Sequence, residues 1–129
     1  SDKVEVVVNQ FPERGRFFSF QLGAQHLKTG NYCFFQNIDN PFTSVEILKS
    51  LYQYREFADV IIPAFKSESG HPVLFSPAVA HKIGGISETD IRINQFLKTF
   101  SIRKIELSES MILVNINTPD DYKAACIGE

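Results

Sequence analysis

The sequence predicts an α/β fold in which a mostly parallel, mixed sheet carries helices on both faces. Two observations predict this class. Short runs of β-branched and aromatic residues alternate along the chain with segments whose apolar residues recur at helical spacing. The chain has 129 residues, 43% of them hydrophobic, which is enough to bury one core. We therefore expect residues 1–129 to form a single domain, with ligands at the carboxyl ends of the strands.

The first half of the chain predicts two strands, each followed by a helix. Residues 4–8 (VEVVV) are almost all β-branched, which predicts a short buried strand. Residues 15–27 have apolar side chains near one face at helical spacing and predict an amphipathic helix. Residues 32–38 (YCFFQNI) predict a second buried strand, and Thr43 or Ser44 is the expected N-cap of the helix that follows.

The second half predicts a third strand and a series of shorter elements. Residues 58–65 (ADVIIPAF) predict the strand, with Pro63 at its end or on an edge, because proline has no N–H to donate to a sheet. Residues 66–70 predict a polar turn before a short return strand at 73–75. The other expected elements are helices at 77–83 and 91–100, strands at 102–107 and 111–116, and a C-terminal helix with Thr118 as N-cap and Pro119 as first residue.

The charge and the cysteines of the chain exclude several classes of protein. A formal net charge of −2 and a pI near 5.9, without clustered Lys or Arg, are not typical of proteins that bind nucleic acid or anionic membranes. The apolar runs are too short to span a bilayer. Cys33 and Cys126 have none of the spacings of a metal site, which indicates buried thiols in a reducing compartment. We expect a cytoplasmic protein that binds neither nucleic acid nor membrane.

Polar residues concentrate in three loops of the predicted fold. The first is Asn37-Ile38-Asp39-Asn40-Pro41, at the end of an apolar strand. A carboxylate at the carboxyl edge of a sheet, next to a helix N-terminus, suits a hard divalent cation that also contacts phosphates, so Asp39 is the candidate metal ligand. The alternative is that Asp39 begins an ordinary turn with Asn40 and Pro41.

The second loop is Ser69-Gly70-His71-Pro72. Gly70 frees the backbone to approach a ligand, and His71 could donate a hydrogen bond to an anionic or carbonyl group. The alternative is a hairpin turn with a half-exposed histidine.

The third loop is residues 115–121 (NINTPDD). The amide oxygens of Asn115 and Asn117 could serve as neutral ligands for Mg²⁺. The alternative is that Asn117-Thr118-Pro119 is an ordinary helix entry.

Taken together and in order, these loops resemble those of the MobA-like nucleotidyltransferases, the molybdopterin cytidylyl- and guanylyltransferases. Asn37-Ile38-Asp39-Asn40-Pro41-Phe42 is similar to the family's central Asp-x-Pro motif, and Gly70-His71-Pro72-Val73-Leu74-Phe75 to its Gly-His-Pro loop. Residues 115–122 (NINTPDDY) are similar to its signature near the C-terminus, and Asn9 with residues 15–23 to a strand that ends in Asn before a helix. The resemblance covers nearly the whole chain and implies part of a nucleotide-diphospho-sugar transferase fold.

The resemblance also implies a role for each loop in nucleotidyl transfer. Asp39 would bind Mg²⁺, with Asn117 or Asn115 as a second ligand. This reaction depends on positioning and charge neutralisation more than on covalent chemistry by side chains. Arg14 and Arg16 could contact the phosphate of the acceptor; the alternative is that they are solvated residues at the start of a helix. The residues that would contact the phosphorylated acceptor are Ser69, Gly70, His71, Arg14, Arg16 and Ser19.

The chain departs from the family pattern in two ways. Many members have Gly where this chain has Ile38, and cytidylyltransferases often have Asp where Asn115 and Asn117 stand. The family's opening Leu-Ala-Ala-Gly-x-Ser-x-Arg-Met-Gly loop, which cradles the triphosphate and reads the base, has no counterpart within these 129 residues. We therefore expect the chain to be the C-terminal portion of a nucleotidyltransferase domain.

The sequence leaves three functions open. The first is a transferase portion that binds Mg²⁺ and the acceptor, for NMP transfer from CTP or GTP to a molybdopterin-like phosphorylated acceptor; its partners are the nucleoside triphosphate and that acceptor. The second is a non-catalytic binding module that kept the fold. The third is a hydrolase or a sugar-phosphate nucleotidylyltransferase that uses the same Asp39. Because the family's first strand is central in its sheet, we also expect self-association through uncovered strands.

Overall fold

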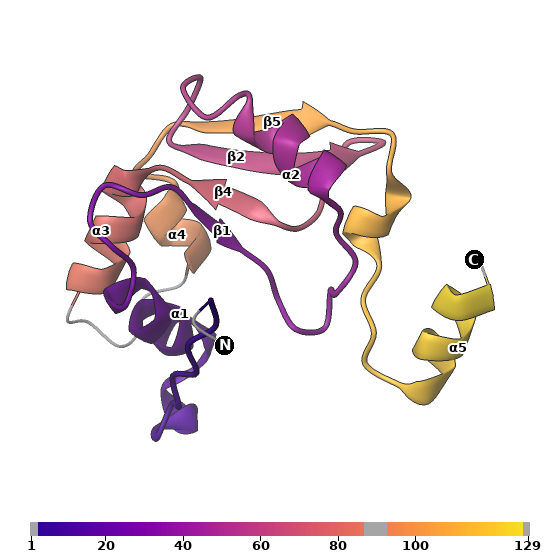
Figure 1. Ribbon diagram of the computed structural model, residues 1–129, viewed down its shortest axis with the longest axis horizontal. Helices are drawn as coiled ribbons and strands as arrows, with labels where there is room; N and C mark the ends of the chain where they lie inside the picture. The colour runs from indigo at the N-terminus through magenta and orange to yellow at the C-terminus, as the bar shows by residue number, and fades with distance from the viewer. Residues whose placement is uncertain (1–2, 87–92, 128–129) are drawn as a thin grey trace.

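A computed structural model describes residues 3–86 and 93–127 of the chain (Figure 1). The described residues form a five-stranded sheet with helices around it. The strands are β1 (Cys33–Phe35), β2 (Val60–Phe65), β3 (Glu68–Ser69), β4 (Val73–Phe75) and β5 (Ile102–Glu106). The α-helices are α1 (Arg16–Gln25), α2 (Val45–Tyr52), α3 (Pro77–Gly85), α4 (Ile93–Leu97) and α5 (Pro119–Ile127), and the 3-10 helices are η1 (Pro12–Arg14) and η2 (Ser110–Leu113).

The sheet is mixed, as the sequence predicts. Its strands are ordered β1-β4-β2-β3, and β5 pairs with β2. Among the described strands the β2–β5 pair alone is parallel, because β4 runs in the opposite direction between β1 and β2. Strands β1, β2 and β5 nevertheless point the same way, so the expected mostly parallel sheet is correct for the direction of these strands and wrong for their pairing. Their carboxyl ends lie along one edge of the sheet.

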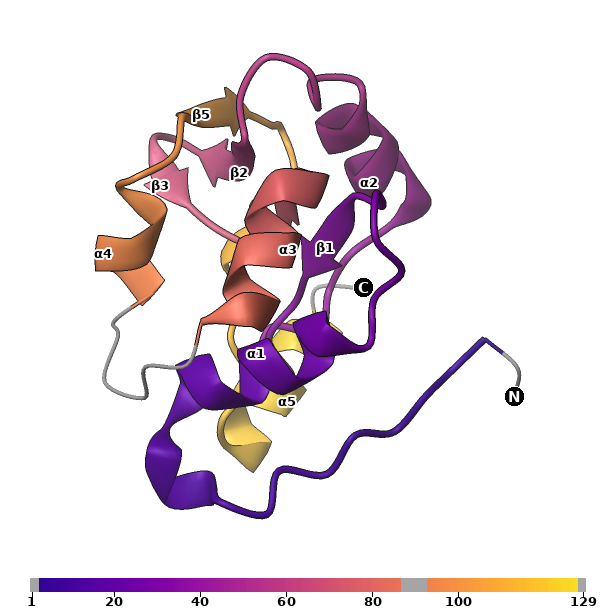
Figure 2. The ribbon, with the colours of Figure 1, turned by 90° about the vertical axis from the view of Figure 1, so that its left-hand side faces the viewer.

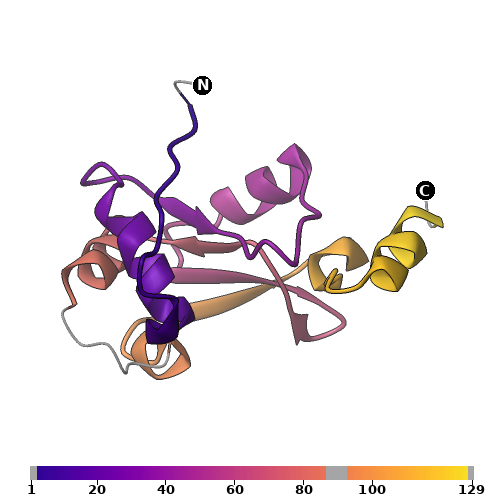
Figure 3. The ribbon, with the colours of Figure 1, turned by 90° about the horizontal axis from the view of Figure 1, so that it is seen from below.

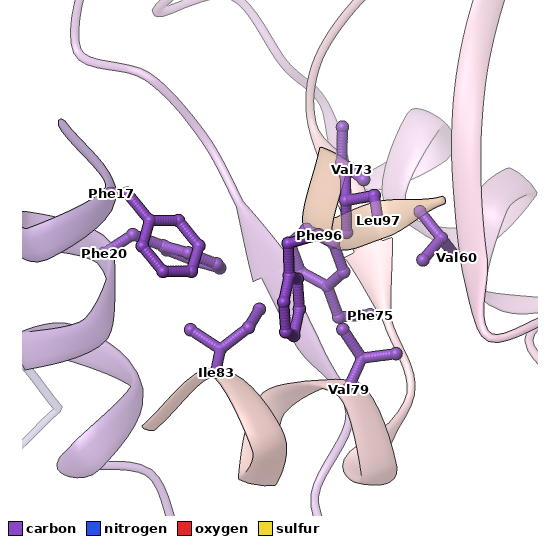
Figure 4. Close-up of a cluster of buried hydrophobic side chains, with 9 residues drawn as sticks. All are labelled: Phe17, Phe20, Val60, Val73, Phe75, Val79, Ile83, Phe96 and Leu97. Carbon is purple, nitrogen blue, oxygen red and sulfur yellow. The ribbon is translucent and has the colours of Figure 1, made fainter. Parts of the chain in front are cut away.

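Helices cover both faces of the sheet, as predicted (Figure 3). Val60 and Ile61 are neighbours in β2 but point to opposite faces, because side chains alternate along a strand. Full burial of each large apolar side chain stabilises the fold by about 2 kcal/mol. The cluster under α1, α3 and α4 contains Phe17, Phe20, Val60, Val73, Phe75, Val79, Ile83, Phe96 and Leu97 (Figure 4). The cluster under α2 contains Ile47, Leu51, Ile61, Leu74, Ile105 and Ile112.

Side-chain caps define where α2 and α5 begin. Ser44 is the N-cap of α2, and its hydroxyl accepts a hydrogen bond from the N–H of Ile47 at 3.2 Å. Pro119 is the first residue of α5, and the hydroxyl of Thr118 before it accepts from the N–H of Asp121 at 3.1 Å. Both helix starts confirm the sequence prediction, because capping chemistry acts over three residues and is visible locally.

The other predicted elements are present with shifted ends, apart from two strands. The helix predicted at 91–100 corresponds to α4, although residues 91–92 lie outside the described residues, and α4 ends at Leu97. None of the helices in the described part of the chain is long and apolar enough to cross a membrane.

The strand predicted at residues 4–8 is wrong. Figure 2 shows this stretch running past α1 without joining the sheet, and no described strand pairs with it. Val4, Val6 and Val8 are 68%, 82% and 71% exposed. A strand needs a neighbouring edge to receive its N–H and C=O groups, and residues 4–8 do not reach the open edge that β1 leaves.

The strand predicted at residues 111–116 is also wrong, because its backbone bonds to other loops. Residues 110–113 form η2. The carbonyl of Ile112 accepts from the N–H of His71 at 3.1 Å and from the side-chain amide of Asn40 at 3.2 Å. That amide also donates to the carbonyl of Val114 at 2.8 Å. Carbonyls used in this way do not serve a sheet.

Pro63 lies inside the central strand β2, not at an end or an edge as expected. Strand β2 pairs with β4 up to Ile61 and with β3 from Ala64, so Pro63 lies opposite a bulge formed by residues 70–73. The carbonyl of Pro63 accepts from the N–H of Gly70 in this bulge at 2.8 Å. Because the ladder is interrupted at this point, the missing N–H of proline removes no sheet bond.

Candidate functional site

Three loops meet at the carboxyl edge of β1, β2 and β5 (Figure 1). Residues 36–41 follow β1, residues 66–72 connect β2 to β4, and residues 107–118 lead from β5 to α5. The N–H of Ile116 donates to the carbonyl of Asp39 at 2.6 Å, which joins the first loop to the third. The fold therefore brings the three polar motifs of the sequence to one place.

Asp39 borders a hollow of about 690 Å³ beside β1, which we call the Asp39 hollow. Apolar side chains of α1 and β1, such as Phe20 and Phe34, form much of its wall. Asp39 is half-buried and Asn117 is exposed, so a ligand could reach both from solvent. The polar side chains of its wall include Arg16, Ser19, Asn37, Asp39 and Asn117.

A second space of about 250 Å³, which we call the His71 cavity, is lined by the loop between β2 and β4. Ser69, Gly70 and His71 form its polar side, and side chains of the core beneath it are apolar. Arg16 and Asn37 line both this cavity and the Asp39 hollow. Phe20 and Phe35 line both spaces as well, so the two spaces are adjacent and share a wall that is partly polar and partly aromatic.

His71 is held by neighbours from two other segments. Its Nε2 lies 3.3 Å from Nδ2 of Asn37, and its ring meets that of Phe35 edge-on with centroids 6.2 Å apart. Because the Asn37 amide nitrogen donates, His71 Nε2 accepts and its Nδ1 carries the proton. Burial lowers the pKa of His71, and the negative charge of Asp39 partly opposes this effect. His71 is therefore neutral near pH 7, with Nδ1 as a hydrogen-bond donor.

Gly70 allows the second loop to pass close to η2. A Cβ atom at this position would lie 2.4 Å from the carbonyl oxygen of Ile112, which is closer than non-bonded atoms pack. The sequence predicts that Gly70 lets the backbone approach a ligand, whereas the group that the structure places against it is the backbone of Ile112 in the same chain. This contact sets the position of His71, the next residue along.

Two of the predicted site residues do not line either space. The guanidinium of Arg14 stacks over the rings of Phe11 and Phe18, at 4.5 and 5.0 Å from their centroids. The side-chain oxygen of Asn115 accepts from the amide of Asn40 at 3.3 Å. The structure does bring together the remaining predicted residues around the two spaces: Arg16, Ser19, Asp39, Ser69, Gly70, His71 and Asn117.

Asn37 is a residue that sequence reasoning did not assign to the site. It contacts His71 and belongs to the shared wall. Its place just after the predicted strand, in the same polar motif as Asp39, was the available signal, and the turn over residues 37–40 brings both side chains to the hollow.

The donor atoms around Asp39 suit a hard cation. Within the described ranges, no group of three or more His, Cys, Asp or Glu residues could hold a metal ion. Mg²⁺ does not need such a group, because it is usually bound by one or two carboxylates together with water and substrate phosphates. Burial raises the pKa of Cys33, which also lines the hollow, so a thiolate ligand is disfavoured there.

Comparison with known proteins decides the family. The family model of the MobA-like NTP transferase domain matches residues 1–105. The chain belongs to the MobA-like NTP transferase family. A relative of this MobA-like domain, the molybdenum cofactor cytidylyltransferase of Escherichia coli (strain K12), is 25% identical over 123 residues. The match covers 95% of this chain and 62% of the relative, so the chain spans less than two thirds of that protein.

Solved structures share the fold of this MobA-like domain. Molybdopterin-guanine dinucleotide biosynthesis protein A from Archaeoglobus fulgidus has a TM-score of 0.65 at 23% identity, over 89% of this chain and 64% of that one. Rv0371c from Mycobacterium tuberculosis H37Rv has a TM-score of 0.69 at 15% identity, over 85% and 58%. The structure of Rv0371c in complex with manganese has a TM-score of 0.63 at 15% identity, over 82% of this chain and 57% of that one. At these identities the likeness establishes the fold alone.

Proposed function

We propose that the chain supplies the cation- and acceptor-binding part of a nucleotidyltransferase. In the intact protein it would hold Mg²⁺ and a molybdopterin-like phosphorylated acceptor while NMP is transferred from CTP or GTP. The family and the cytidylyltransferase relative support this reaction class. The observation that carries the proposal is the wall of Arg16 and Asn37, which borders both the Asp39 hollow and the His71 cavity. A cation and an acceptor phosphate on its two sides would be neighbours.

In such a reaction an oxygen of the acceptor phosphate attacks the α-phosphorus of the triphosphate. A new P–O bond forms, the bond between the α-phosphorus and the bridging oxygen breaks, and pyrophosphate leaves with the electron pair. Mg²⁺ would neutralise the charge of the phosphates. Asp39 would be its carboxylate ligand and Asn117 the next, whereas Asn115 is a weaker candidate because its side-chain oxygen already accepts from Asn40.

The remaining side chains would bind and orient the acceptor. Arg16 begins α1 and Ser19 follows one turn later on the same side, so both could contact a phosphate at the shared wall. Arg14 is engaged with aromatic rings, which makes it a weaker candidate. Neutral His71 would donate from Nδ1 to an anionic or carbonyl oxygen, beside Ser69 and Gly70.

Two observations support a divalent cation at Asp39. The side chains that could bind it present carboxylate and amide oxygens, which hard cations prefer. A solved protein of the same fold is described as a complex with manganese. Mn²⁺ accepts similar oxygen ligands to Mg²⁺, and it is a convenient paramagnetic probe.

The test is Mn²⁺ binding by the purified chain, followed through water proton relaxation. We expect Asp39→Asn to weaken binding by tenfold or more, because Asp39 is the carboxylate of the hollow. Glu56→Gln is the control for lost charge, since Glu56 is exposed and precedes β2, at the opposite end of that strand. Equal Mn²⁺ affinity in all three proteins would rule out the cation site.

Turnover separates nucleotidyl transfer from the alternatives. The chain is incubated with CTP or GTP, Mg²⁺ and a phosphorylated pterin, and pyrophosphate is measured. Cation binding without pyrophosphate release would favour a non-catalytic module. Release with a sugar phosphate but not with the pterin would favour a sugar-phosphate nucleotidylyltransferase, and nucleotide cleavage without any acceptor would favour a hydrolase.

The open side of β1 supports the expected self-association. Strand β1 pairs with β4, and no strand in the described part of the chain pairs with its other side. Residues 4–8, four of which are valine, also lack a described strand partner. Unpaired strand edges of this kind favour association between chains. We infer that the isolated chain self-associates through these two surfaces.

A further inference from the structure

Asn40 lies buried between the loop after β1 and the loop after β5, and is 1% exposed. Its Nδ2 donates to the carbonyls of Ile112 and Val114 at 3.2 and 2.8 Å, and to the side-chain oxygen of Asn115 at 3.3 Å. Its Oδ1 accepts from the side-chain amide of Gln36 at 2.9 Å. One buried amide therefore joins the two loops.

The backbone beside Asn40 makes a second connection between the same loops. The N–H of Ile116 donates to the carbonyl of Asp39 at 2.6 Å. Asn117, the next residue, donates its N–H to the carboxylate of Asp121 in α5 at 3.0 Å. Figure 1 shows α5 lying to the side of the sheet, so the place of Asn117 relative to Asp39 is set through these hydrogen bonds.

We propose that Asn40 is a positioning residue that fixes the separation of Asp39 and Asn117, so that one divalent cation can contact both. The inference rests on the proposed cation site and adds a residue to it. Asn40 is not part of the wall of the Asp39 hollow. Its effect on the cation passes through its hydrogen bonds to the loop after β5.

An amide side chain matches the partners at this position. Two carbonyls and the Asn115 oxygen need a donor, while the amide of Gln36 needs an acceptor, and asparagine offers both. Aspartate would offer acceptors alone and would place a second negative charge next to Asp39. Leucine would fill the volume but leave these buried groups unpaired.

The test is a double-mutant cycle on the whole chain, read by Mn²⁺ affinity. Asn40→Ala should weaken Mn²⁺ binding by about tenfold or more, as residues that orient metal ligands commonly do. Asn117→Ala should weaken binding in the otherwise unchanged chain. In the Asn40→Ala background it should have no further effect, because Asn117 no longer reaches the cation.

Gln21→Ala is the matched control. Gln21 is another buried amide, 3% exposed, and it donates to the carbonyl of Ile86 at 2.8 Å, away from the three loops. Its loss should lower the unfolding temperature but leave Mn²⁺ affinity unchanged. In the Gln21→Ala background, Asn117→Ala should weaken Mn²⁺ binding as much as it does in the otherwise unchanged chain. If Asn40→Ala does not fold, Asn40→Ser, which keeps one hydroxyl donor, goes through the same cycle.

The possible outcomes distinguish this inference from the proposed function. If Asn117→Ala weakens Mn²⁺ binding equally with and without Asn40, the positioning role is overturned and the cation site stands. If Asp39→Asn binds Mn²⁺ as well as the unchanged chain, both the cation site and the positioning role are overturned. Loss of the Asn117 effect with Asn40, and its persistence in Gln21→Ala, would support the role.

Discussion

The carboxyl edge of the sheet and the N-terminal stretch differ in burial. Polar residues are usually exposed and apolar ones buried, and in these two regions the reverse is found. At the edge, a polar residue such as Asn40 is 1% exposed. In residues 4–8, four of five residues are valine, and Val6 is 82% exposed. The Asn40 amide is buried where it finds hydrogen-bond partners, and the strand-forming valines stay in solvent where they join no strand edge. At these two places the available partner decides burial more than the residue type does.

The largest effect is expected at the carboxyl edge of the sheet, from a side chain added at Gly70. An added Cβ would lie 2.4 Å from the carbonyl oxygen of Ile112 and would force η2 away. We expect Gly70→Ala to lower the free energy of unfolding by about 3 kcal/mol in urea denaturation. Gly23→Ala in α1 is the control, since its Cβ meets nothing within 4 Å and should stabilise the helix by about 0.5–1 kcal/mol. If Gly70→Ala lost no more stability than Gly23→Ala, η2 would have to move aside at little cost.

The next prediction concerns the apolar N-terminal stretch. Val6→Lys should shift the chain from dimers or larger species towards monomer in sedimentation velocity, because a lysine disfavours strand pairing. Val6 is 82% exposed, so the fold itself should lose less than about 0.5 kcal/mol. Val45→Lys, at a 60% exposed site on α2, should leave the size unchanged. A monomeric starting chain would contradict the inferred self-association.

A smaller effect is expected between Asp39 and His71. Burial holds the pKa of His71 below its usual 6.5. The neutral form therefore contributes stability above that value, and this stability is lost as the pH falls from there towards the lower folded pKa. Because Asp39 raises the pKa of His71, Asp39→Asn should lower it further in an NMR titration, whereas Glu56→Gln should not. An unchanged pKa in Asp39→Asn would show that the two loops are farther apart in solution.

The smallest effect is expected where the N-terminal stretch touches α1. Glu5 Oε1 and His26 Nδ1 lie 2.7 Å apart, on side chains that are 64% and 46% exposed. Exposed pairs contribute little, so Glu5→Gln should change the free energy of unfolding by less than about 0.5 kcal/mol. The change should vanish at high salt. A larger, salt-independent loss would mean that residues 4–8 are docked more firmly than their exposed valines indicate.

Much of the fold could be predicted because its signals are local. Ser44 and Thr118 cap N–H groups three residues away, and the apolar periodicity of α2 and α3 is complete within each helix. The strands expected at 4–8 and 111–116 carry equally good local signals. Whether a run becomes a strand depends, however, on an edge supplied from elsewhere in the chain, which local composition does not report.

The candidate site could be predicted as far as its motifs reach. Asp39 and His71 stand in loops that the family resemblance singles out, and the fold brings these loops together. The stacking of Arg14 on aromatic rings and the bond from Asn40 to Asn115 arise only on folding. In sequence, Asn40-Pro41 is an ordinary turn signal. The carbonyls that accept from the Asn40 amide, those of Ile112 and Val114, lie 72 and 74 residues further along the chain.

Pro63 also has a consequence for how the second loop could change. Any other residue at this position would bring a buried N–H that the bulge of residues 70–73 would have to satisfy, and the proline ring brings none. The space available to the His71 loop is thus partly determined by the opposite strand. A substitution of Pro63 would therefore act on the loop above it, although the residue itself belongs to the strand.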